Sequence, residues 1–445
     1  MTLARFTWWP IPLWLLPMIY TVISVMASCV LPRLEHAYLP EYQHVMAVGS
    51  ALAYFSSISS GMLALTGVVF AIAFVVVQFS ALAYSPRLVL LFSRDPTTYN
   101  ALGIFFATFV YSLTTITWTD RDGSGVPLFS SILVAVLLVI SLLMFAKLIQ
   151  NLSNLQINNV LRTIGGHGRE VIREMFVRLP NYADPSQQLD SAATVNLGEP
   201  VQRIIYVGEP LVITKFEITR LVNLATGAGA VLVIECGVGE TVLDGTELAR
   251  VYGAAKPLQE HAVMAGIRLA TTRTYEQDPK YAIRLLVDIA IRALSPAVND
   301  PTTAVQALDQ IEDLLRRLGR RELDAGRACD KGGAVRLSFP VPTWGDYLAL
   351  SFDEIRRFGA TSVQVTRRLR SALVGLSEAV GGDRHEAVLK YIEHLNTGVG
   401  RADWDEQDRA SALEEDRQGL GLSRKRPTVQ PHAGAVHPFP NAAIG

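Results

Sequence analysis

The sequence predicts a multi-domain membrane protein, with an α-helical transmembrane bundle at the N-terminus and a soluble α+β region after it. The first third of the 445-residue chain contains long uncharged segments, whereas charged residues are spread through the remainder. Uncharged segments of about 20 residues cross a bilayer as helices. The soluble remainder reads first as short β-branched runs and then as amphipathic helices, which indicates a small β-barrel or sandwich-like module packed with a helical bundle.

We predict about four spans within a transmembrane domain of residues 1–151. They are expected at residues 8–31, 61–83, 101–119 and 126–149. The uncharged stretch from Val45 to Pro86 is about twice as long as one span requires. Two alternatives stay open for it: a surface helix that leads into the second span, or two crossings that turn at residues 56–61 (SSISSG).

Arginine residues in the short loops predict the orientation of the spans. Arg87 and Arg94 lie on the same side of the predicted bundle as Lys147 and the soluble region, while the turn at residues 120–125 carries both signs of charge. Cytoplasmic loops are enriched in Lys and Arg. We therefore expect a multi-pass membrane protein with the N-terminus and the C-terminal domain in the cytoplasm.

A stripe of hydroxyl groups marks the third predicted span. Its members are spaced four, three and four residues apart, which places them on one helical face: Thr108, Ser112, Thr115 and Thr119. They could line a pore in an oligomer. The alternative is that they bond to their own backbone or to a neighbouring helix. No charged residue lies within this span, which argues against a buried proton relay.

The soluble region divides by its sequence pattern into four parts. We expect a juxtamembrane helical linker at 152–200, a β-rich module at 201–252, a helical domain at 253–400 and a disordered tail at 401–445. The glycines of residues 165–168 (GGHG) predict an interruption of the linker helix, with His167 exposed on a loop.

The β-rich module contains one hairpin with a known counterpart. Residues 239–251 resemble the repeated hairpin of barrel-sandwich modules such as biotinyl and lipoyl domains. The tip, Leu243-Asp244-Gly245, lacks the lysine that those domains modify, so no swinging-arm role is implied.

Two polar segments supply the candidate ligand-binding residues. They are TRTYEQDPKY (272–281) and ALSPAVNDPTT (293–303), and the candidates are Arg273, Glu276, Gln277, Asp278, Asn299 and Asp300. Such carboxylate and amide groups suit a cation or, through water, a phosphorylated ligand. The alternative is structural, because Asp278 and Asp300 each precede a proline, the pattern of a helix N-cap followed by proline at the first helical position.

Other classes of chemistry lack their signatures. The sequence has no phosphate-binding GxxxxGK loop and no GxSxG nucleophile motif, so an enzyme is the least favoured class. Its three cysteines, Cys29, Cys236 and Cys329, are far apart and do not predict a metal site. The net charge of −1 does not favour nucleic-acid binding. We predict no metal and no cofactor.

Several phrases resemble a known family. They are GMLALTGVVF followed by YSPRL and FSRD, then GIFFATFVYSL, and above all RTYEQDPKYAIRLLVDIAIRALSPAVNDPTTAVQALD. These strings are similar to those of bacterial predicted membrane proteins grouped as domain of unknown function 2254. The resemblance implies a membrane-embedded N-terminal region and a soluble half, but no activity.

The sequence favours a membrane-anchored sensing or scaffolding protein, whose cytoplasmic domain binds a small ligand or a protein partner. An oligomeric ion channel gated by that domain is the first alternative, and a membrane-bound enzyme is the second. For partners, we expect the lipid bilayer and a second copy of the chain, giving a homo-oligomer.

Overall fold

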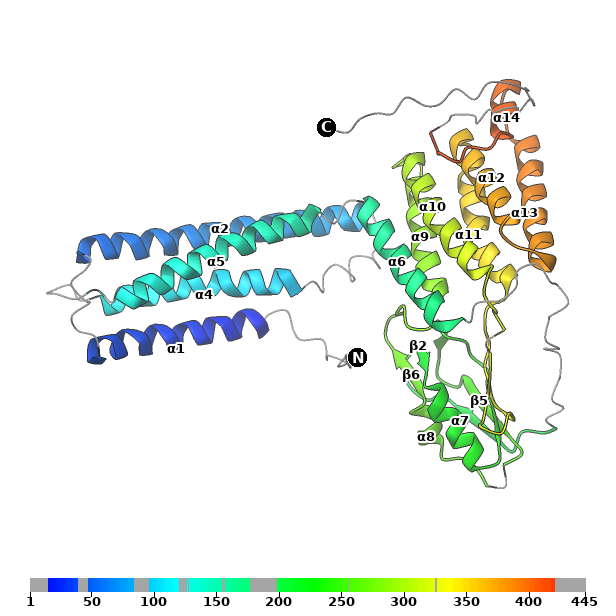
Figure 1. The fold of residues 1–445 in the computed structure, drawn as a ribbon, viewed down its shortest axis with the longest axis horizontal. Helices are drawn as coiled ribbons and strands as arrows, with labels where there is room; N and C mark the ends of the chain where they lie inside the picture. Colours follow the sequence, from blue (N-terminus) through cyan, green and yellow to red (C-terminus); the bar gives the residue numbers. More distant parts are fainter. Residues whose placement is uncertain are drawn as a thin grey trace, which may run out of the picture.

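The N-terminal part of the protein is a bundle of four long helices. A computed structural model describes residues 15–38, 47–83, 96–119, 126, 128–153, 157–176, 198–254, 256–324 and 326–420. Each bundle helix is long and apolar enough to cross a membrane: α1 (Leu15–Tyr38), α2 (Val48–Ala83), α4 (Pro96–Trp118) and α5 (Leu128–Ser153). They lie side by side along the long axis of the molecule, and the soluble region lies at one end of the bundle (Figure 1). Helix α4 packs against the other three.

Helix α2 is continuous, so residues 56–61 do not turn the chain between two crossings. It extends over 36 residues and includes the predicted span 61–83, and its candidate span among the described residues is Val48–Ile72. In a bilayer, backbone groups without partners cost several kcal/mol, so serine and glycine alone do not end a helix there. Helix α1 also differs from expectation: its candidate span is Leu15–Glu35, and residues 8–14 lie outside the described residues.

Glu35 joins α1 to α5 at the end of the bundle far from the soluble region. Its side chain is 3% exposed. One carboxylate oxygen accepts a 2.8 Å hydrogen bond from the backbone N–H of Phe129, and the other lies 3.4 Å from that of Ser130. A carboxylate at a helix N-terminus satisfies free N–H groups and offsets the partial positive charge there. The first candidate span thus includes a charged residue that the predicted range 8–31 left outside.

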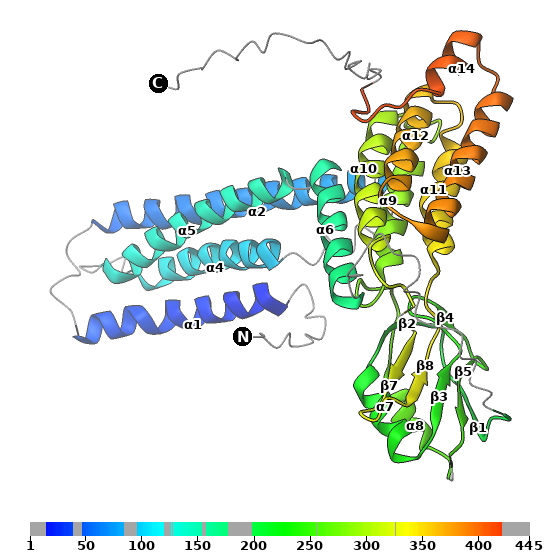
Figure 2. The same ribbon diagram turned by 45° about the vertical axis from the view of Figure 1, so that its right-hand side comes forward.

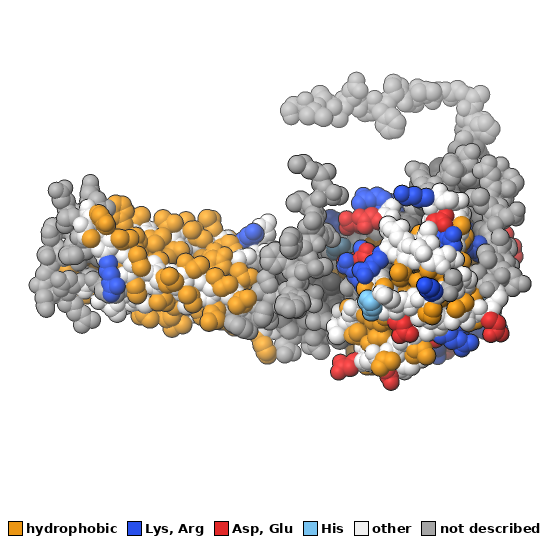
Figure 3. Space-filling model, turned by 90° about the horizontal axis from the view of Figure 1, so that it is seen from below, with side chains coloured by type: hydrophobic (Ala, Val, Ile, Leu, Met, Phe, Trp, Pro, Cys, Tyr) orange, Lys and Arg blue, Asp and Glu red, His pale blue; other side chains and the backbone are white. Residues whose placement is uncertain are grey.

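The bundle exposes large apolar side chains outward. Examples on α1 and α5 are Met18, Ile23, Met26, Val139 and Leu143. Figure 3 shows this apolar band along the bundle, and a mixture of charged and apolar groups on the soluble region. Since lipid tails solvate apolar groups and water does not, these faces are suited to a bilayer.

Helix α6 (Ile157–Met175) connects the bundle to the soluble region and has no interruption at residues 165–168. It lies between the bundle and the helices α9 (Pro279–Ala293) and α10 (Pro301–Leu318) (Figure 2). A Cβ atom at Gly168 would lie 2.8 Å from a Leu314 methyl group and 3.0 Å from the Ala282 Cβ atom. The predicted interruption of the linker helix is therefore wrong. Gly168 does not break α6; it lets α6 approach α9 and α10 closely.

The helical part of the soluble region forms one core. Its further members are α11 (Trp344–Phe358), α12 (Val363–Ser377) and α13 (Gly382–Arg401). A short helix, α14 (Glu406–Ala412), follows α13. The chain then packs against the soluble helical core, including α12, as far as residue 420. There Asp416 is buried, and the side-chain amide of Gln364 donates to the Gly419 carbonyl at 2.6 Å. Residues 402–420 thus differ from the tail expected from residue 401, and 421–445 lie outside the described residues.

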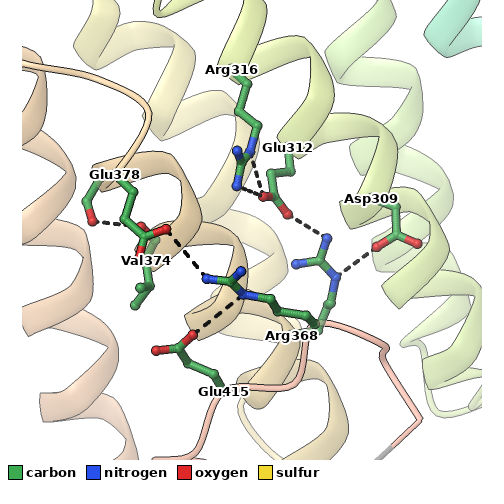
Figure 4. Close-up of polar contacts among 9 residues, drawn as sticks. Asp309, Glu312, Arg316, Arg368, Val374, Glu378 and Glu415 are labelled. Atoms are coloured by element: carbon green, nitrogen blue, oxygen red, sulfur yellow. Dashed lines mark hydrogen bonds and ion pairs between the residues drawn. The ribbon is translucent and has the colours of Figure 1, made fainter. Parts of the chain in front are cut away.

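An ion-pair network centred on the buried Arg368 joins α12 to α10 (Figure 4). The guanidinium of Arg368, 6% exposed, contacts Asp309 at 2.8 Å and Glu312 at 2.6 Å. The other oxygen of Glu312 pairs with Arg316 at 2.8 Å. Buried ion pairs add little net stability, but removal of one partner leaves an uncompensated charge. The network therefore fixes the register between the two helices.

The β-rich part consists of two open sheets and is not a barrel, which corrects the predicted barrel-like module. The larger sheet has the order β1 (Gln202–Ile205), β5 (Glu247–Tyr252), β3 (Val231–Ile234), β8 (Val335–Ser338), β7 (Arg327–Cys329). The smaller sheet has the order β4 (Thr241–Val242), β2 (Leu211–Phe216), β6 (Ile267–Ala270). Strands β4 and β5 flank the 243–245 tip but belong to different sheets, so the biotinyl-like hairpin is not formed.

The β-rich part is built from distant segments of the chain. Strand β8 pairs in parallel with β3, with Leu337 opposite Leu232. Strands β6, β7 and β8 thus lie in the region 253–400 that was expected to be helical. Each has only three or four residues, too few for an alternating pattern to be recognised. Helices α7 (Ile218–Gly227) and α8 (Glu260–Met264) complete this part, whose apolar side chains form a second core.

We predict that Gly168→Ala destabilises the protein, because its methyl group would overlap Leu314 and Ala282. Overpacking of this kind costs about 1–3 kcal/mol. The matched control is Gly166→Ala, where the nearest atom to the new Cβ is 3.9 Å away. That change should raise stability, since alanine favours helix over glycine by about 0.5–1 kcal/mol. Thermal unfolding of the detergent-purified chain measures both, and equal effects would contradict the packing role.

Candidate ligand-binding site

The six predicted ligand-binding residues lie on two loops at opposite ends of α9. Residues 271–278 connect β6 to α9, and residues 294–300 connect α9 to α10. Helix α9 has 15 residues, so the two loops are separated by roughly 22 Å. The structure therefore does not bring Asn299 and Asp300 together with the other four candidates.

Asp300 serves the helix that follows it, as the capping alternative predicts. One carboxylate oxygen accepts a 3.1 Å hydrogen bond from the Thr303 backbone N–H, and the other accepts from the Thr303 hydroxyl at 2.6 Å. Asn299 precedes it in the left-handed region, with φ of 48°, and its N–H donates to the Ser295 carbonyl. This loop is a turn between two helices.

Gln277 attaches the first loop to the small sheet. Its side-chain carbonyl accepts from the Phe216 backbone N–H at 2.9 Å, and its amide donates to the Phe216 carbonyl at 3.1 Å. The side-chain amide thus makes the two hydrogen bonds to Phe216 that a neighbouring strand would make at the end of β2. Its φ of 52° shows that the backbone adopts a conformation that side chains disfavour in order to place this group.

Asp278 occupies the N-cap position of α9 but does not cap it. It is 2% exposed, and neither carboxylate oxygen makes a well-formed hydrogen bond, although the backbone N–H groups of Lys280 and Tyr281 lie close enough to favour its ionised form. The turn at Gly239 covers it: a Cβ atom there would lie 2.5 Å from an Asp278 oxygen, and the φ of +87° also requires glycine. Burial raises the pKa of the Asp278 carboxyl, and the positive charges of Lys280 and Arg273 offset only part of that shift.

A cavity of about 930 Å³ lies beside this loop, between the small sheet and the helices. Its walls come from α6, from β2 and β6, from the first turn of α9, from α11, and from the segments 275–277 and 339–342. Two of the segments that connect the β-rich part to the helices therefore border it. This volume falls within the range of small-ligand sites.

Two buried tyrosine hydroxyls in the cavity lining have no partner. Tyr347 is fully buried, Tyr275 is partly buried, and neither hydroxyl makes a hydrogen bond. Burial raises the pKa of both phenols, and the negative charge of Asp278 adds to the shift at Tyr347. Both therefore remain protonated near neutral pH and can donate. Buried polar groups without partners are rare in native proteins and mark places where water or a ligand binds.

Three cationic side chains reach the same cavity. Lys215 on β2 and Arg268 on β6 are direct cross-strand partners, and both line it. They share one carboxylate, Glu217, at 4.0 and 2.8 Å. Lys280, in the first turn of α9, donates to the Val238 carbonyl at 3.0 Å. None of these cations was among the predicted residues, because cross-strand register is not readable from one sequence.

The mouth of the cavity carries exposed acidic groups. Glu170 and Glu174 lie on α6, and Glu276 lies on the loop before α9. His167 is exposed on α6 rather than on a loop, and its ring stacks on that of Tyr275 with centroids 4.7 Å apart. Of the predicted residues, Glu276 and Gln277 thus line the cavity, while Arg273 and Asp278 lie behind it near Gly239. Within the described residues, no group of three His, Cys, Asp or Glu side chains is arranged to bind a metal.

The hydroxyl stripe of α4 is buried inside the bundle. Thr108, Ser112, Thr115 and Thr119 each donate to a carbonyl oxygen one turn earlier. The Thr108 hydroxyl also lies 2.9 Å from that of Ser141 on α5. This geometry packs α4 against α5. A pore lined by these residues stays a prediction.

We predict that Asp278→Asn stabilises the protein at pH 7, on the order of 1 kcal/mol, because it removes a buried charge that makes no well-formed hydrogen bond. Since the folded pKa is raised, ionisation opposes folding as the pH rises above the unfolded value. The gain should therefore shrink as the pH falls toward 4. Asp346→Asn is the control with opposite sign, because hydrogen bonds from Thr343 lower the pKa of Asp346. Thermal unfolding across pH 4–8 measures both, and a destabilised Asp278→Asn would refute the prediction.

Comparison with known proteins identifies relatives over most of the chain. The uncharacterized proteins Rv1290c of Mycobacterium tuberculosis and Mb1321c of Mycobacterium bovis are each 24% identical to it over 440 residues. These matches cover 96% of this chain and 82% of each relative. No solved structure shows significant similarity. Residues 12–374 match the family described as "Predicted membrane protein (DUF2254)", and since this is more than half of its length, the chain belongs to that family.

Proposed function

We propose that this protein is a membrane-anchored sensor that binds a small ligand in the cavity between its small sheet and its helices. The observation that carries this proposal is Tyr347, a residue of the cavity lining whose hydroxyl is buried and has no hydrogen-bond partner. A buried polar group left unpaired costs about 1–3 kcal/mol. A ligand that accepts a hydrogen bond there would recover that cost.

The position of α6 supports a sensing role rather than simple binding. This helix begins shortly after α5 leaves the membrane bundle, and four of its residues between 170 and 175 line the cavity. Its opposite contacts, through Gly165 and Gly168, leave no room for independent sliding against α10. A ligand would thus contact the helix that continues from the membrane.

We place the soluble region on the cytoplasmic side of a bacterial plasma membrane. The support is the charge of the short loops: Arg87 and Arg94 precede α4, and Lys147 lies near the end of α5. Cytoplasmic loops are enriched in such residues. A reporter enzyme active only in the periplasm, fused to the C-terminus, should be inactive, and its activity would reverse this orientation.

The ligand site is tested with Tyr347→Phe. Removal of an unpaired hydroxyl should leave the thermal stability of the empty protein equal or higher, while a bound ligand should lose affinity by about tenfold. A thermal-shift screen of polar metabolites on the detergent-purified full chain finds the ligand. Hydrogen exchange of residues 271–278 then reports whether it protects the loop that borders the cavity.

Tyr206→Phe is the matched control. Its hydroxyl already donates to the Glu209 carbonyl at 2.6 Å, and it does not line the cavity. This variant should lose some stability and keep full ligand affinity. The proposal fails if no metabolite in the screen depends on Tyr347, or if Tyr347→Phe destabilises the empty protein as Tyr206→Phe does.

A further inference from the structure

The cavity contains more hydrogen-bond donors than its own acceptors use. Lys215 approaches Glu217 only to 4.0 Å, while Arg268 takes the same oxygen at 2.8 Å. The pair of cations and its one carboxylate thus carry a net charge of +1 on this wall. An ammonium group has three donors, and those of Lys215 have no closer acceptor among the described residues.

Lys280 adds another cationic group to the cavity lining. Its ammonium group donates to the Val238 carbonyl, and its charge also acts on the carboxyls of Asp278 and Asp346, where it favours the ionised form. The N-terminus of α9, a helix of 15 residues, contributes further partial positive charge at this position. Tyr275 and Tyr347 belong to the same lining, and their buried hydroxyls are donors without acceptors.

The remaining wall is apolar and includes flat groups. It is formed by Val171, Ile218, Phe339, Pro340 and Pro342. Such a surface suits the face of a planar ring. The glutamates at the mouth are exposed, where water screens their charge, and they can accept from hydroxyl or amino groups. The cavity therefore offers separate places for an anionic group, a ring and polar donors.

We infer that the cavity binds a phosphate-bearing small molecule with a planar ring, the class of the nucleoside monophosphates. The phosphate lies between Lys215 and Lys280 and accepts from the tyrosine hydroxyls, and the ring lies against Phe339 and the prolines. A purely cationic ligand would leave the surplus donors unused. This inference rests on the proposed ligand-binding function and names the chemistry of its ligand.

The test measures binding to the full-length protein in detergent by isothermal titration. The probes are purine and pyrimidine nucleoside monophosphates, the matching nucleosides, inorganic phosphate, and spermidine as a cation. We expect at least one monophosphate to bind ten times or more tightly than its nucleoside, with an affinity that falls as salt is added. Lys215→Ala and Lys280→Ala should each weaken it by about tenfold.

Lys331→Ala is the matched control, because Lys331 is exposed in the turn between β7 and β8 and does not line the cavity. It should leave the affinity unchanged, and unfolding temperatures verify that each variant folds. Equal binding of nucleoside and nucleotide, or no effect of the two lysine variants, would overturn the inference. If spermidine or another phosphate-free compound binds and needs Tyr347, the ligand-binding function stands and only its assigned chemistry fails. If no probe and no metabolite binds, both fail.

Discussion

The close approach of α6 to α9 and α10 is the constraint on which the arrangement of the soluble region depends. At Gly168 the neighbouring side chains leave no space for a methyl group, so the helices can meet only with glycine there. One side of α6 is used for this contact, and its last two turns border the cavity. The same helix therefore packs on the helical core and forms one wall of the binding site.

Buried polar groups without hydrogen-bond partners lie in and beside the cavity. Asp300 and Asp346 carry carboxylates that are bonded to backbone N–H groups, as helix caps usually are. Asp278 is at the N-cap of α9, as Asp300 is at that of α10, yet its carboxylate is buried without a well-formed hydrogen bond. The Tyr347 hydroxyl is in the same state. Stability given up in one small region is a common property of binding sites.

Sequence patterns were sufficient where the physical cause is local. Long apolar segments predicted the four membrane helices, since a bilayer selects directly on hydropathy. The Asp-Pro pair at residues 300–301 predicted a capped helix. The same pair at 278–279 predicted a cap that is absent, because the turn at Gly239, almost forty residues earlier, closes over the carboxylate.

Other features depend on tertiary contacts that a single sequence does not display. The glycines of α6 have low helix propensity, so the sequence alone indicates an interruption of the helix. The structure shows that Gly168 is instead a contact position, where Leu314 and Ala282 leave no space for a side chain. Lys215 and Arg268 are 53 residues apart and meet only through the register of β2 and β6. The five-stranded sheet likewise depends on the pairing of β3 with β8, which no local pattern indicates.

The parallel pairing of β3 with β8 has a consequence for biosynthesis. Until residue 338 has left the ribosome, β3 presents an open edge of hydrogen-bonding groups, while α9 and α10 have already been made. Exposed strand edges are sites of misassociation. The helices are therefore available to assemble on α6 first, and the sheet is completed last. A fragment that ends at residue 252 would keep that edge permanently open and should aggregate, however well its own strands pair.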